Sequence, residues 1–147
     1  MDVRELYQEI IMDHNRSPRN HRAIAHPTRH AIGFNPLCGD KLTVYLHIQK
    51  NVIQDISFIG CGCAISQASA SLMTEAIMNK TVEEADDLFK QFHNMLTLDE
   101  ASSSLSLDKL SVLAGVRLFP ARVKCATLAW HTLDAALKKD DATVSTE

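Results

Sequence analysis

The stretch that decides the fold reads LTVYLHIQKNVIQDISFIGCGC and covers residues 42–63. Apolar and polar residues alternate over residues 42–48, which is the period of a strand with one buried face. A lysine–asparagine pair follows as a hairpin turn, and residues 52–59 are rich in β-branched and aromatic side chains, which favours a second strand. The sequence therefore predicts two antiparallel strands that deliver Cys61 and Cys63 to a corner loosened by neighbouring glycines.

Helical periodicity surrounds this hairpin. Apolar residues recur at helical spacing in residues 3–11, 65–76, 82–96, 107–116 and 119–137. Thr81 and Glu84 have the spacing of a capping box, which marks the start of the third of these helices. Between residues 15 and 36, prolines, arginines and histidines replace the periodic pattern, so this segment is predicted to be a long basic loop.

Composition sets the class of protein. The chain has 147 residues, 46% of them hydrophobic, which suits a single domain over residues 1–138 with a flexible polar tail at residues 139–147. A net charge of −3 argues against a nucleic-acid or polybasic membrane protein. No signal-like start and no apolar run of about 18 residues is present, so we expect a cytoplasmic protein with reduced cysteines.

The cysteines suggest a metal site. Cys38 lies in a turn with Asp40, Cys63 at a strand-to-helix junction, and Cys125 near the start of the last helix. Such junctions allow residues that are distant in sequence to converge at one end of a sheet. Three thiolates and a carboxylate form a tetrahedral zinc set, although spacing alone leaves Cys63 and Cys125 equally consistent with small buried apolar residues.

Other candidates are weaker. Cys61 is either a spare ligand beside Cys63 or an incidental strand cysteine. Seven histidines are present, and the pair His26 and His30 in the basic loop shares no fixed face, so solvated or capped histidines are the better interpretation. Arginines in the same loop form a candidate docking surface for an acidic partner. These arginines are Arg16, Arg19 and Arg22.

Several motifs agree in order and spacing with one known family. They are Leu6-Tyr7, Ile10-Ile11, Asp13-His14, Pro18-Arg19-Asn20, Asn35-Pro36-Leu37-Cys38-Gly39-Asp40, Gly62-Cys63-Ala64-Ile65-Ser66, Ala68-Ser69-Ala70-Ser71, Met73-Thr74, Phe119-Pro120-Ala121-Arg122-Val123-Lys124-Cys125-Ala126 and Trp130. On these residues the chain resembles the SufU-type branch of the IscU/NifU N-terminal family, over residues 3–138.

This resemblance implies an α+β fold, with helices packed on a small antiparallel sheet of about three strands. It implies a zinc site formed by Cys38, Asp40, Cys63 and Cys125. It also implies a role in iron–sulfur cluster assembly, in which Cys38 accepts persulfide sulfur from a SufS-like, pyridoxal-phosphate-dependent cysteine desulfurase. Downstream iron–sulfur assembly machinery would then receive that sulfur.

Two features distinguish the SufU-type branch from the scaffold branch. Scaffolds carry a histidine where this chain has Lys124, and they lack the segment at residues 98–108. Arg122 matches an arginine of the SufU pattern, and its expected role is to hold Asp40 or to steer a persulfide. The alternative is a scaffold that binds iron or a nascent iron–sulfur cluster through the same four ligands. A further alternative is an interaction module in which zinc has a purely structural role.

Overall fold

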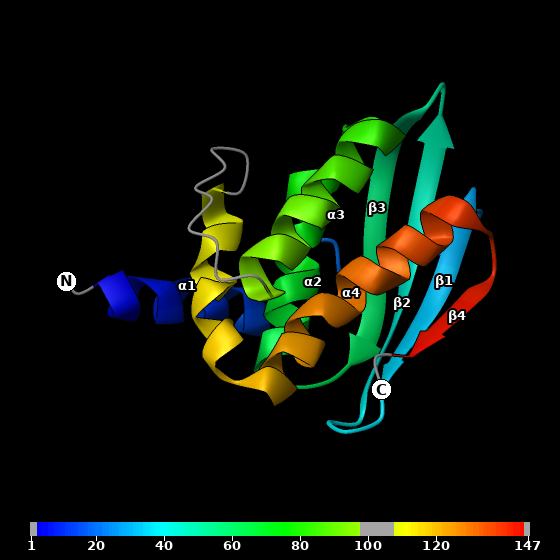
Figure 1. Ribbon diagram of the computed structural model, residues 1–147. Helices are drawn as coiled ribbons and strands as arrows, with labels where there is room; N and C mark the ends of the chain where they lie inside the picture. Colours follow the sequence, from blue (N-terminus) through cyan, green and yellow to red (C-terminus); the bar gives the residue numbers. More distant parts are fainter. Residues whose placement is uncertain (1–2, 98–107, 146–147) are drawn as a thin grey trace.

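A four-stranded mixed sheet with helices on one face forms the architecture (Figure 1). The computed structural model describes residues 3–97 and 108–145. Its elements in chain order are α1 (Val3–Arg16), β1 (Arg29–Asn35), β2 (Asp40–Gln49), β3 (Val52–Cys61), α2 (Ala64–Ile77), α3 (Val82–Thr97), the 3-10 helix η1 (Asp108–Leu118), α4 (Pro120–Lys138) and β4 (Ala142–Ser145).

The sheet corrects the expectation of about three antiparallel strands. Its order is β3-β2-β1-β4, and β4 runs parallel to β1 whereas the other pairs are antiparallel. The first additional strand, β1, occupies part of the segment expected to be a basic loop. The second, β4, lies within residues 139–147, where a flexible tail was expected, and Asp141 N–H donates to His30 O at 2.9 Å as the chain enters it.

The predicted hairpin is confirmed. Lys50 and Asn51 both adopt positive φ, 53° and 66°, as a tight turn between twisted strands requires. From this turn β3 runs back along β2, and the register pairs Lys41 with Cys61. The open end of the hairpin therefore holds Asp40 on one strand and the start of α2 beyond the other.

The helices form the second layer. α4 contacts β1 and β2, and α2 contacts β3. The predicted capping box is present, since Glu84 N–H donates to Thr81 Oγ1 at 3.1 Å and Thr81 N–H donates to Glu84 Oε1 at 3.0 Å. Phe92 of α3 stacks on Trp130 of α4 with ring centroids 4.6 Å apart. The largest fully buried side chains are Trp130, Phe58, Phe92, Leu46, Ile53, Ile56, Leu72, Met73, Ile77, Leu96, Leu113 and Leu128.

Residues 17–28 form a strap that crosses α2 and reaches β3. The Asn20 side chain donates to Thr74 Oγ1 at 3.0 Å, and Phe58 N–H donates to Asn20 O at 3.1 Å. Arg22 makes a two-pronged ion pair with Asp55, at 2.7 and 3.0 Å. The strap is therefore anchored along its length, and Arg22 already has a partner within the chain.

The helix expected at residues 107–116 is the 3-10 helix η1, and the serine-rich residues before it lie outside the described part of the chain. Among the described residues, no helix is both long and apolar enough to cross a membrane.

Candidate metal centre

A turn between β1 and β2 carries the first two candidate ligands. Gly39 has a φ of +70°, which a glycine adopts without strain, and Cys38 N–H donates to Asn35 O at 3.3 Å. This turn leaves Cys38 exposed and directs Asp40 inward, where the side chain is 2% exposed. One ligand therefore faces solvent and the other is held in the protein.

The junction between β3 and α2 holds the Asp40 carboxylate in place. Cys63 N–H donates to Asp40 Oδ1 at 2.8 Å. A Cβ on Gly62 would lie 2.5 Å from the same oxygen, so only glycine allows this approach. Cys63 is the N-cap of α2, and its Sγ accepts the Ser66 N–H at 3.4 Å.

Cys125 completes the centre from α4. Its side chain is fully buried, and its Sγ lies 3.1 Å from Cys38 Sγ. Burial, followed by the hydrogen bonds with Cys38 and Cys63, raises the pKa of Cys125 well above its usual range. A buried thiol of this kind becomes a thiolate when a cation is present to balance the charge.

The ligand atoms of Cys38, Asp40 and Cys125 all lie within 4.8 Å of one another. Cys63 lies next to this group, because its N–H donates to Asp40 and its side chain contributes to the raised pKa of Cys125. The Cys63 sulfur is not within 4.8 Å of all three of these ligand atoms. Figure 1 shows the three contributing segments at one end of the sheet. Sulfur and carboxylate oxygen are zinc ligands, so this donor set fits zinc.

Asn35, at the end of β1, is a member of the centre that was not predicted from the sequence. Its Nδ2 lies 3.4 Å from Asp40 Oδ2 and 3.5 Å from Cys125 Sγ, and the side chain is fully buried. The residue belongs to the quoted Asn35-Pro36-Leu37-Cys38 motif, but asparagine before proline is ordinarily a turn residue. Its role becomes visible only once β1 pairs Asn35 with Asp40.

Arg122 lies beside Cys63. The negative charge of Cys63, and then that of Cys125, raises the pKa of Arg122. Asp40 receives hydrogen bonds from Cys63 N–H and Asn35 Nδ2. Arg122 and Cys63 also line a groove of about 970 Å³, whose other lining residues are Gln8, Ile11, Ala64, Ile65, Val112, Gly115, Val116, Leu118 and Phe119. The guanidinium is thus placed to attract an anion to the thiols.

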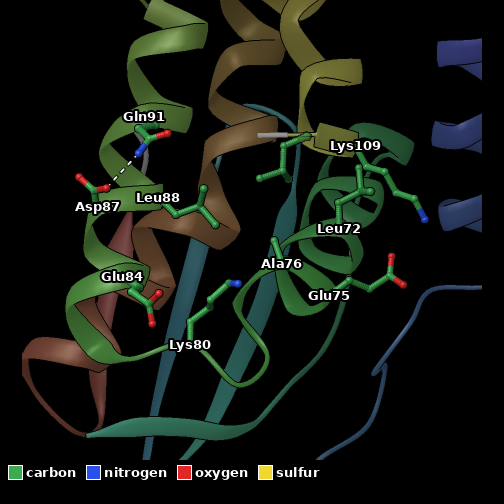
Figure 2. A pocket seen from close by; sticks show the side chains of 10 residues that line it. Leu72, Glu75, Ala76, Lys80, Glu84, Asp87, Leu88, Gln91 and Lys109 are labelled. Atoms are coloured by element: carbon green, nitrogen blue, oxygen red, sulfur yellow. Dashed lines mark hydrogen bonds between the residues drawn. The ribbon is translucent and has the colours of Figure 1, made fainter. Parts of the chain in front are cut away.

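The remaining candidates lie outside the centre. Cys61 is exposed at the end of β3 and is not part of the ligand cluster among the described residues. His30 contacts Asp140 and Asp141, at 3.2 and 3.1 Å, near the start of β4. A second hollow has a volume of about 730 Å³ and is lined by the charged residues Glu75, Lys80, Glu84, Asp87 and Lys109 together with apolar side chains. Figure 2 shows these side chains. None of its lining residues is a cysteine or a histidine.

Comparisons with known proteins show which proteins this chain resembles. Residues 6–145 match the model of the NifU-like N terminal domain. The chain is 39% identical to the zinc-dependent sulfurtransferase SufU of Bacillus subtilis, covering 92% of both chains. It is also 39% identical to the iron-sulfur cluster assembly scaffold protein IscU of Thermotoga maritima, covering 95% of this chain and 97% of that protein.

A solved structure has the same fold as this chain. The crystal structure of an iron-sulfur cluster assembly scaffold protein for the SUF system, from Fervidobacterium islandicum, superposes with a TM-score of 0.85 at 37% identity. The match covers 92% of this chain and 99% of that chain.

Proposed function

This chain belongs to the family of NifU-like N-terminal domains, and from that membership we propose that it is a zinc-dependent sulfur-transfer protein of iron–sulfur cluster assembly. The sulfur would come from a SufS-like cysteine desulfurase and pass to downstream assembly machinery. One observation carries this proposal: Cys38 is exposed, whereas Cys63 and Cys125 are half-buried and buried on helices.

Cys38, Asp40, Cys63 and Cys125 would hold the zinc. Bound zinc keeps sulfur ligands as thiolates and undergoes no redox reaction of its own. The thiolate is the form of cysteine that attacks another sulfur. A Cβ placed on Gly39 would meet no atom within 4 Å other than those of its chain neighbours, so the turn next to Cys38 is open on that side. These features support Cys38 as the residue that meets the partner.

The transfer is an exchange at sulfur. The Cys38 thiolate attacks the outer sulfur of the partner's cysteine persulfide, a new S–S bond forms on Cys38, and the partner's own S–S bond breaks. The partner's cysteine leaves as a thiolate, and the transferred sulfur keeps its proton. No net oxidation occurs. Arg122, beside Cys63, supplies a positive charge that stabilises the attacking and leaving thiolates of this exchange.

The alternative function is a scaffold that binds a nascent iron–sulfur cluster through the same four ligands. Its support is that similar proteins of Thermotoga maritima and Streptococcus pyogenes are named scaffolds. Lys124, next to Cys125, argues for transfer because a cationic lysine is a poor metal ligand. Anaerobic reconstitution without zinc separates the two functions, since a stable stoichiometric cluster would favour the scaffold.

The test uses purified desulfurase and radiolabelled cysteine sulfur. We expect Cys38→Ser to remove acceptance of labelled sulfur and stimulation of the desulfurase, because the attacking thiolate is gone. Cys61→Ser is the matched control, since Cys61 is also exposed, and it should behave as the unaltered chain. Normal acceptance by Cys38→Ser would rule out the proposed role of Cys38.

A further inference from the structure

The four ligand residues differ in the hydrogen-bond donors that surround them. Both oxygens of Asp40 face N–H donors, Cys63 N–H at 2.8 Å and Asn35 Nδ2 at 3.4 Å. Cys125 Sγ faces Asn35 Nδ2 at 3.5 Å, and Cys63 Sγ faces Ser66 N–H at 3.4 Å. Among the described residues, Cys38 Sγ receives no N–H donor, and it accepts the S–H of Cys125 at 3.1 Å.

Asn35 supplies donors to two of these ligands at once. Its amide nitrogen carries two hydrogens, one for the Asp40 carboxylate and one for the Cys125 sulfur. A reversed amide would place its oxygen against the same carboxylate and sulfur, and like partial charges would repel. The acidic centre therefore fixes the amide orientation.

The orientation leaves Asn35 Oδ1 buried without a hydrogen-bond partner among the described residues. An unpaired buried carbonyl oxygen destabilises a fold. A leucine side chain has a similar branched shape and would carry no unpaired polar atom. The asparagine is therefore better explained by its contacts with Asp40 and Cys125 than by packing of β1 against α4.

We propose that Asn35 is a positioning residue that holds Asp40 and Cys125 in place as ligands of the centre. The inference rests on the proposed function. An N–H that donates to a ligand atom orients that atom and holds it in place. Cys38 has no such donor among the described residues, so its sulfur is the least constrained of the four ligand groups.

The test measures zinc affinity in a Cys38→Ala background, in which only the three fixed ligands remain. A chromophoric chelator competes for the metal, and Asn35→Leu should weaken binding by ~10–100-fold, the usual effect of losing an outer-shell partner. The denaturation midpoint of the metal-free protein should stay the same or rise in Asn35→Leu. Asn35→Ala provides a second variant in which no larger side chain must be accommodated.

Ser57→Ala is the matched control. Ser57 Oγ is also buried without a partner among the described residues, but Ser57 lies in β3 opposite Tyr45, away from the ligands. It should leave zinc affinity unchanged. A merely structural role for Asn35 would lower the metal-free midpoint in both Asn35 variants, and that result would overturn the inference.

Unchanged zinc affinity in Asn35→Leu would also overturn the inference, even if the unaltered chain accepts sulfur normally. Conversely, weakened zinc binding in Asn35→Leu would uphold it even if the unaltered chain accepts no sulfur, and in that case the proposed function fails alone. A Cys38→Ala protein that binds no zinc would overturn the inference, because the three fixed ligands would then not hold the metal.

Discussion

Two clusters of buried polar groups join distant parts of this chain, and they differ in how fully their hydrogen bonds are satisfied. At the contact of α1 with α2, His14 Nδ1 lies 2.7 Å from Ser71 Oγ and His14 Nε2 lies 3.5 Å from Glu75. Both imidazole nitrogens therefore have partners. The second cluster is the candidate metal centre, called the thiol end below, which contains Asn35, Cys38, Asp40, Cys63 and Cys125. There, Asn35 Oδ1 has no hydrogen-bond partner among the described residues, and burial raises the pKa of Cys125.

The difference separates a structural network from a binding site. A buried polar network with every member partnered fixes one arrangement and has no capacity left for a ligand. A cluster with ionisable groups and an unpaired atom is stabilised when a further charge arrives. The α1–α2 cluster thus holds the fold together, whereas the thiol end contains groups that a bound cation would stabilise, as the proposed function requires.

The largest expected effect is stabilisation of the thiol end by zinc. At a free zinc concentration of about 1,000 times the dissociation constant, the free energy of unfolding should rise by about 4 kcal/mol. Hydrogen exchange should slow around Asp40 and Cys125 but not around His14. Asp40→Ala should remove the response, because it removes both a ligand and the acceptor of the Cys63 N–H.

Asp55→Ala is the control for this experiment. It removes a carboxylate that pairs with Arg22 at the surface, so its response to zinc should match that of the unaltered chain. Equal stabilisation of the Asp40→Ala protein would show that zinc acts elsewhere.

The second prediction concerns the α1–α2 cluster and acid. Burial, and then the charge of Arg19, lowers the pKa of His14 below its ordinary 6.5. The unfolded chain therefore binds a proton more readily than the folded chain does. The stabilising effect of the neutral His14 is complete above pH 6.5 and is lost as pH falls through the lowered folded-state pKa. Urea denaturation of metal-free protein between pH 7.5 and roughly pH 5 measures this loss.

His14→Leu should flatten the pH dependence and cost about 1–3 kcal/mol at neutral pH, because Ser71 and Glu75 lose their partner. His131 contributes in the same direction, since burial lowers its pKa too, so some dependence should remain. An unchanged pH profile in His14→Leu would mean that this cluster does not respond to acid.

The sequence predicted the thiol end better than the sheet, and β1 shows why. Its inward residues include Ala31 and Gly33, and a Cβ on Gly33 would collide with Thr132 Oγ1 of α4. Close approach of α4 therefore requires small residues where a strand pattern would show large apolar ones. The larger Ile32 and Phe34 alternate with them and are only half-buried, so the usual signal is reversed.

The strand β4 was missed for another reason. It has four residues, none fully buried, and its parallel pairing with β1 supplies most of its support. Such a strand exists only because its partner is already in place. Asn35 was missed in the same way, since an amide acquires its role from a neighbour that the sequence does not identify. Cysteine and aspartate, in contrast, are ligand types that the sequence shows at element junctions, although spacing alone left Cys63 and Cys125 open and the full ligand set came from the family resemblance.

The smallest expected effect is that of a substitution in the strap. It tests whether the strap only stabilises the fold or also contacts a partner protein. Arg22→Ala breaks an exposed ion pair with Asp55 and should lower the free energy of unfolding by only about 0.2–1 kcal/mol, because both side chains are partly hydrated. Zinc affinity should not change, since no ligand contacts the strap arginine. Association with the desulfurase at low salt should also be unaffected, because Asp55 already neutralises this guanidinium. Slower association at low salt that disappears at high salt would instead make the strap part of the docking surface, and would connect it to the thiol end through a shared partner.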